Sequence, residues 1–100
     1  MTKILIVEDE ESQRIALHDN LAQKGFSVLE AKDGIDGLAV ALREHPDIVL
    51  LDVRMPRMDG MTMMHKLRVD NWGKTATIII LTNYDASDAQ LLQITTDETV

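Results

Sequence analysis

The sequence contains no cysteine, which excludes disulfide bonds and thiolate metal sites. Aromatic residues are nearly absent, with one Phe, one Trp and one Tyr in 100 residues, so the core must be built from aliphatic side chains and Met. Basic residues are outnumbered by acidic ones, 10 to 17, and the net charge of −7 argues against direct binding of nucleic acid or an anionic membrane.

The apolar run near the N-terminus breaks at Glu8, too early for a signal peptide or a membrane span, so we expect a cytoplasmic protein.

The apolar residues alternate between short continuous runs and helical repeats. Strand-like runs cover residues 4–7, 26–31, 48–51 and 77–81. Apolar residues at helical spacing cover 11–24, 35–42, 61–67 and, weakly, 88–94. Gly25 and Pro46 stand where the first two of these helices should end. The order βαβαβαβα predicts an α/β fold, a doubly wound parallel sheet with helices on both faces, formed by one domain over residues 1–100.

Polar residues follow the predicted strands at the edge where such sheets bind ligands. Glu8 and Asp9 follow the first strand, Asp52 ends the third, and Thr82 ends the fourth. If the third strand lies beside the first, these side chains converge beyond the carboxyl ends of the strands. Grouped carboxylates suit a hard cation such as Mg²⁺, and a carboxylate is a competent nucleophile for phosphoryl transfer. Each acid alone is more often a cap or a turn residue, so the prediction depends on their co-occurrence.

Three segments resemble the receiver domains of two-component response regulators: ILIVEDE at 4–10, IVLLDVRMPRMDG at 48–60 and IIILT at 78–82. The resemblance implies a flavodoxin-like fold with strand order 2-1-3-4 and a phosphorylation-dependent signalling switch. The phosphoryl donor would be a sensor histidine kinase or a phosphotransfer protein. Phosphorylation would reshape the surface around the fourth helix.

The same resemblance implies a role for individual residues. Asp52 corresponds to the phosphoacceptor, and Thr82 to the switch hydroxyl. Glu8, Asp9, Asp52 and the backbone carbonyl of Arg54 correspond to the groups that hold Mg²⁺.

Several positions depart from the family pattern. Asn83 stands where the family usually has Ala or Gly, and we expect Arg54, Asn83 and Tyr84 to flank the site and tune the lifetime of the phosphoryl group. The sequence ends at Val100, before the family's fifth strand, its phosphate-pairing lysine and its fifth helix. We therefore expect four βα units of a five-unit fold, incomplete at the C-terminus, with no residue in the role of that lysine. An unpaired edge on the fourth strand would favour a homodimer through that edge or through exposed core.

Two other functions fit parts of the pattern. A Mg²⁺-dependent phosphohydrolase with an aspartyl nucleophile commonly carries a second Asp two residues later, where this sequence has Arg54. A degenerate receiver would act only as an interaction module; the retained acids argue against it, and the absent lysine argues for it. The leading prediction is a phosphoacceptor domain that catalyses at most its own phosphorylation and slow dephosphorylation.

Overall fold

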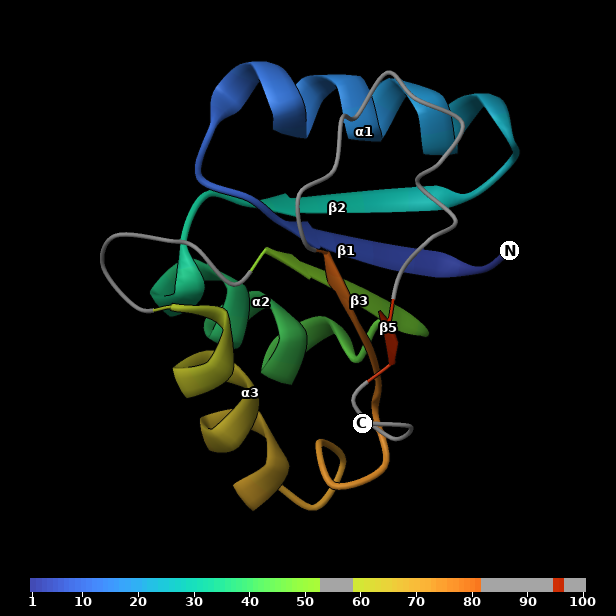
Figure 1. The fold of residues 1–100 in the computed structure, drawn as a ribbon. Helices are drawn as coiled ribbons and strands as arrows, with labels where there is room; N and C mark the ends of the chain where they lie inside the picture. Colours follow the sequence, from blue (N-terminus) through green and yellow to red (C-terminus); the bar gives the residue numbers. More distant parts are fainter. Residues whose placement is uncertain (53–58, 82–94, 97–100) are drawn as a thin grey trace.

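The computed structural model describes residues 1–52, 59–81 and 95–96. Its first seven elements, in chain order, are β1 (Lys3–Val7), α1 (Glu11–Gln23), β2 (Ser27–Ala31), α2 (Gly34–Glu44), β3 (Ile48–Asp52), α3 (Gly60–Val69) and β4 (Thr77–Leu81). The four strands are parallel in the order β2-β1-β3-β4 (Figure 1). This confirms the predicted fold class and strand order. The helix predicted over 88–94 lies outside the described residues.

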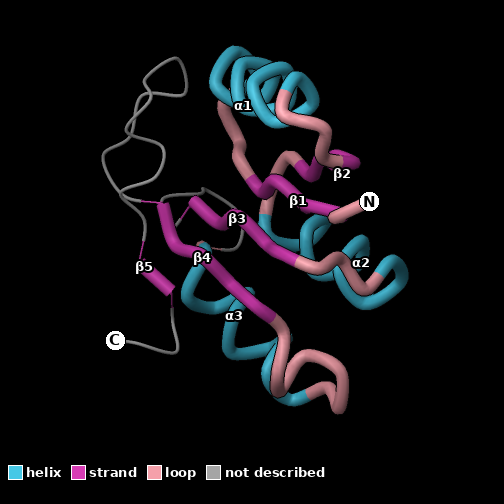
Figure 2. The backbone as a smooth tube through the Cα atoms, turned by 90° about the vertical axis from the view of Figure 1, so that its right-hand side faces the viewer, coloured by secondary structure: helices cyan, strands magenta, loops and turns pink. Residues whose placement is uncertain are grey.

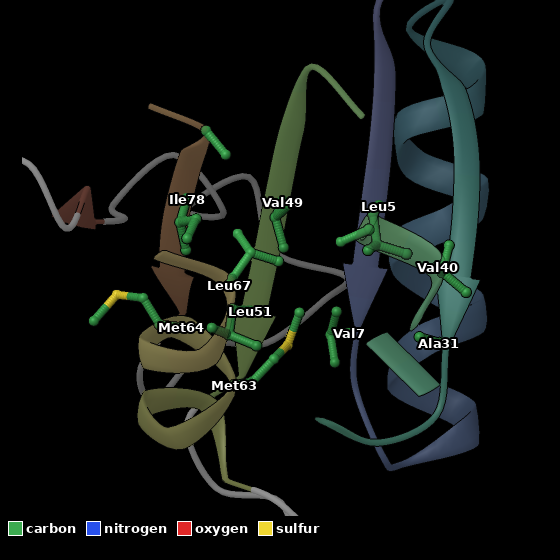
Figure 3. Packing of buried hydrophobic residues seen from close by; sticks show 12 residues of the cluster. Leu5, Val7, Ala31, Val40, Val49, Leu51, Met63, Met64, Leu67 and Ile78 are labelled. Carbon is green, nitrogen blue, oxygen red and sulfur yellow. The ribbon is translucent and has the colours of Figure 1, made fainter. Parts of the chain in front are cut away.

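The central strands β1 and β3 are buried on both faces, because helices cover both of the sides to which their successive side chains point. In β1, Leu5 and Val7 join the cluster that packs against α2 and α3 (Figure 3), whereas Ile4 and Ile6 join Leu17 of α1. Figure 2 shows the sheet between α1 on one side and α2 and α3 on the other. A strand without a solvent face needs an unbroken apolar run, which is why the sequence of β1 shows no alternation.

Helix α2 approaches the end of β1 closely because residue 37 is glycine. A Cβ atom there would lie 2.9 Å from both methyl groups of Val7 and 3.2 Å from Cε of Met63. The helix therefore holds the last residue of β1 in a fixed position, directly before Glu8.

Helix α3 forms over the residues whose apolar spacing predicted a helix. Met63, Met64 and Leu67 form its buried face, whereas Met61 is 42% exposed. Met63 lies close to α2, since a Cβ atom on Gly37 would lie 3.2 Å from its Cε atom.

The helix ends follow the expected stop signals. Lys24 caps α1, and Gly25 has φ of +93°, the left-handed conformation that glycine adopts without strain. Helix α2 ends at Glu44, and the capping residue His45 has φ of +46° directly before the predicted stop, Pro46. The imidazole of His45 stacks on the indole of Trp72, with ring centroids 4.6 Å apart.

Two helices begin at aspartate caps. Asp33 accepts a hydrogen bond from the backbone N–H of Asp36 at 2.8 Å, and Asp59 accepts one from the N–H of Thr62 at 2.8 Å. The hydrogen bond from Thr62 holds the pKa of the Asp59 carboxyl below its ordinary value of 3.8. The Asp59 cap fixes the start of α3, the first described element after Asp52.

The fourth strand does not have the fully open edge that we predicted. A two-residue strand, β5 (Thr95–Thr96), pairs antiparallel with β4 and places Thr95 opposite Ile80 and Thr96 opposite Ile79. The prediction of an unpaired edge was wrong at these two positions. A strand of only two residues is too short to show a repeating pattern of apolar residues in the sequence. The sheet therefore has the order β2-β1-β3-β4-β5.

Candidate functional site

The candidate site lies at the carboxyl ends of β1 and β3, where the topology of the sheet changes direction. From β1 the chain crosses through α1 to β2 on one side, while β3 is followed by α3 on the opposite face (Figures 1 and 2). Val7 pairs with Leu51 across these two strands, so Glu8 and Asp52 follow at neighbouring positions. Diverging crossovers leave a crevice at such a point, which is where ligands bind in open parallel sheets.

Three carboxylates meet at this edge. One side-chain oxygen from each of Glu8, Asp9 and Asp52 lies within 4.8 Å of the other two. Glu8 is 3% exposed and Asp52 is 6% exposed, whereas Asp9 is open to solvent. The structure thus brings together the three acids that the sequence placed at the strand ends. Within the described ranges, this is the one group of at least three His, Cys, Asp or Glu side chains close enough to hold a metal ion.

The donor set fits a hard divalent cation. Three negative charges at this distance repel one another strongly when two of them are shielded from water. Carboxylate oxygens are the ligands that Mg²⁺ prefers, and this ion is usually held by few carboxylates while it keeps water or phosphate oxygens. When bound, such an ion would neutralise the carboxylates and the oxygens of a phosphoryl group.

Backbone hydrogen bonds fix the turn that carries Glu8 and Asp9. The N–H of Glu8 donates to the carbonyl of Ala31 at 3.1 Å, which extends the pairing of β1 with β2. The N–H of Glu10 donates to Oε2 of Glu8 at 2.9 Å. The carbonyl of Glu8 accepts a hydrogen bond from Nη1 of Arg14 at 3.0 Å. Each polar group of the Glu8 backbone therefore has a partner.

Arg14 is the residue near this site that sequence reasoning missed. Its position one turn after Glu10, in a helix that leaves the acidic strand end, was the available signal. A periodicity argument assigns such a residue to a solvated helix face, whereas Arg14 reaches back to the strand end.

Several predicted site residues lie outside the described residues, namely Arg54, Thr82, Asn83 and Tyr84. The neighbouring described residue, Leu81, pairs with Asp52 across β3 and β4. The pairing register therefore brings the described end of β4 to the same edge of the sheet as the acids.

Comparisons with known proteins identify the family and agree with the fold. A sequence model for the family described as "Response regulator receiver domain" matches residues 4–98. The chain belongs to the response regulator receiver domain family. Receiver domains are signalling switches of two-component systems, rather than classical enzymes, and they interact with histidine kinases or phosphotransfer proteins.

Among its curated relatives, the receiver domain is 35% identical over 86 residues to sporulation initiation phosphotransferase F of Bacillus subtilis, covering 86% of this chain and 68% of that protein. It is 38% identical over 84 residues to the response regulator MprA of Mycobacterium leprae, covering 84% of this chain. The match spans only 36% of the length of MprA.

Solved structures show the same fold. The chemotaxis protein CheY4 of Vibrio cholerae superposes with a TM-score of 0.80 at 31% identity, covering 93% of this chain and 76% of that one. The receiver domain of a sensor histidine kinase from Pseudomonas aeruginosa superposes with a TM-score of 0.81 at 29% identity, covering 96% and 80%. The latter structure has a magnesium ion coordinated in its active-site cleft. Within the described part of our receiver domain, none of the helices is both long and apolar enough to cross a membrane.

Proposed function

We propose that this domain is a phosphorylation-dependent switch in which Asp52 accepts a phosphoryl group in the presence of Mg²⁺. The observation that carries the proposal is the convergence of Asp52 with Glu8 and Asp9 at the switch point of the sheet. Two relatives support it by what their descriptions say: one is a phosphotransferase, and another holds magnesium in its cleft. We place the domain in the cytoplasm, with a sensor histidine kinase or phosphotransfer protein as its donor.

The proposed reaction is a transfer between two nucleophiles. An oxygen of the Asp52 carboxylate attacks phosphorus, and the bond from phosphorus to the donor nitrogen or oxygen breaks. The bonding electrons leave with the donor, and Asp52 becomes an acyl phosphate. Glu8 and Asp9 would hold the cation, together with Asp52 and the carbonyl of Arg54.

The later steps of the proposal involve residues beyond the described ranges. We assign the switch hydroxyl to Thr82 and the tuning of phosphoryl lifetime to Arg54, Asn83 and Tyr84. The expected consequence is a changed surface around the predicted fourth helix. Self-association through the edge of β4 stays a prediction with reduced support, because β5 already pairs with Ile79 and Ile80.

Incubation with acetyl phosphate and Mg²⁺, followed by intact-mass analysis and phosphate release, tests the proposal. We expect one persistent phosphoryl adduct, which disappears in Asp52→Asn and in excess EDTA. The matched control is Asp19→Asn, which removes the charge of an exposed acid on α1 and should leave the adduct intact.

The outcome separates the three candidate functions. Rapid phosphate release without accumulation would identify a phosphohydrolase instead. No adduct, even with a kinase-derived phosphohistidine donor, would leave a receiver that acts only as an interaction module. An adduct that persists in Asp52→Asn would refute the assignment of the acceptor.

A further inference from the structure

The guanidinium of Arg14 connects the acidic strand end to the neighbouring strand β2. Its Nη1 donates to the carbonyl oxygen of Glu8 at 3.0 Å, and its Nε donates to Oε1 of Glu30 at 3.0 Å. The Arg14 side chain is only 16% exposed, and its contact with the Glu8 carbonyl is partly buried, whereas the contact with Glu30 is exposed to solvent. The second oxygen of Glu30 lies 2.5 Å from Nδ1 of His18.

The contact to Glu8 acts on one particular peptide group. The carbonyl of Glu8 belongs to the peptide unit between Glu8 and Asp9, which is planar. Fixing that carbonyl fixes the plane, and the plane sets the direction in which the chain continues to the Cα atom of Asp9. Because the N–H of Glu8 is already held by Ala31, the contact from Arg14 completes the restraint on this turn.

Arginine is suited to this task because its donors form a rigid planar fork. One edge faces the Glu30 carboxylate on β2, and Nη1 faces the Glu8 carbonyl. A lysine carries a single compact ammonium on a flexible stem and does not present two donors in fixed directions. The charge and the shape of Arg14 can therefore be tested separately.

Charge alone predicts the opposite effect on a metal site. A positive guanidinium close to the three carboxylates repels a divalent cation, so its removal should strengthen cation binding. If Arg14 acts through geometry, its removal weakens cation binding, because the acids lose their common orientation. Groups that orient metal ligands typically change metal affinity by roughly 10- to 100-fold when they are lost.

We propose that Arg14, oriented by Glu30, is a positioning residue that fixes the Glu8–Asp9 peptide and thereby the cation-binding geometry of Glu8, Asp9 and Asp52. The metal-binding half of this inference rests on the proposed function. The orientation of the peptide does not, because it concerns the protein without any ion.

Calorimetric titration of MgCl₂ into the wild-type chain and its variants tests the effect of Arg14 on cation binding. We expect Arg14→Gln and Arg14→Lys each to raise the Mg²⁺ dissociation constant roughly tenfold, and Glu30→Gln to raise it by a smaller factor. The matched control is Arg43→Gln, since the Nε of Arg43 contacts Glu44 at 3.1 Å near the far end of α2. It should stay within about twofold of wild type, as is typical for an uncoupled surface substitution.

Backbone order in the metal-free protein tests whether Arg14 fixes the Glu8–Asp9 peptide. The NMR order parameter of the Asp9 N–H should be about 0.85 in wild type and Arg43→Gln, and below about 0.6 in Arg14→Gln. A merely structural role would lower the melting temperature without this local change. If Arg14→Gln does not fold, Arg14→Lys and Glu30→Gln decide both measurements.

Each outcome bears on the inference. Equal or tighter Mg²⁺ binding by Arg14→Gln would overturn it, and so would wild-type affinity in Arg14→Lys, because the fork would then be dispensable. Wild-type protein that binds no Mg²⁺ would refute the proposed function instead. In that case an unchanged Asp9 order parameter in Arg14→Gln would overturn the positioning role, and a lowered one would support it.

Discussion

The repulsion among the acids predicts that Asp52→Asn stabilises the protein when no divalent cation is present. Asparagine has nearly the same shape as aspartate but no charge. The substitution therefore removes the repulsion of Asp52 by Glu8 and Asp9 without opening a cavity. A purely structural role of Asp52 predicts the reverse, since removal of a buried hydrogen-bonded charge normally destabilises a protein.

The distance between the carboxylates sets the size of the effect. Two unit charges 4.8 Å apart repel by about 3.5 kcal/mol at an effective dielectric constant near 20, and by about 0.9 kcal/mol in bulk water. Glu8 and Asp52 are both buried, so their pair lies nearer the first value, while exposed Asp9 contributes less. Allowing for weaker hydrogen bonds to the neutral side chain, we expect a gain of about 1–3 kcal/mol in the free energy of unfolding.

Urea unfolding followed by circular dichroism measures this gain, first in EDTA and then across a Mg²⁺ titration. For a domain of this size, about 1 kcal/mol corresponds to a shift of about 4–8 °C in melting temperature. Wild type should gain about 2.7 kcal/mol when Mg²⁺ reaches one hundred times its dissociation constant, and Asp52→Asn should gain little. The order of stability of the two proteins should therefore reverse as Mg²⁺ is added.

Asp19→Asn is the control for this experiment, because it removes one exposed negative charge far from the strand ends. It should stay within about 0.5 kcal/mol of wild type under both conditions. The reasoning is refuted if Asp52→Asn is less stable than wild type in EDTA, or if both proteins gain equally from Mg²⁺.

Two further predictions concern the stability of the fold. Gly73→Ala should destabilise the fold by about 3 kcal/mol in urea unfolding, because its Cβ would lie 1.8 Å from the carbonyl oxygen of Leu67. Gly25→Ala, which meets no atom within 4 Å but has φ of +93°, should cost only about 1–2 kcal/mol, and equal losses would contradict this account. The lowered pKa of Asp59 means that its cap stabilises α3 fully above pH 3.8 and loses this contribution as the pH falls through the lower folded-state value. Wild type should therefore lose stability relative to Asp59→Asn as the pH falls below 3.8, and parallel pH profiles would count against the cap.

Much of the fold could be predicted because each element leaves a local pattern. An unbroken run such as residues 4–7 requires a strand buried on both faces, and the alternation of such runs with helices requires a parallel sheet. The meeting of Glu8 and Asp52 followed from topology alone, because strands that end at the same edge bring their last residues together.

Other features depend on contacts that leave no such pattern. Met63 is buried and Met61 is 42% exposed, and the packing partner of Met63 includes Gly37 on a separate helix, α2. The reach of Arg14 to the Glu8 carbonyl depends on side-chain rotamers and on the position of Glu30 in a separate strand. The pairing of Thr95 and Thr96 with β4 involves backbone groups that every residue carries.

The stack of His45 on Trp72 bears on the intrinsic fluorescence of this protein. Trp72 is the single tryptophan, and it precedes β4 just as His45 precedes β3, so both rings lie at the amino ends of two strands whose carboxyl ends are at the edge that holds Asp52. A five-residue strand separates the two ends by roughly 16 Å. We therefore expect the fluorescence of Trp72 to report on the contact between the end of α2 and the segment before β4, rather than on events at Asp52.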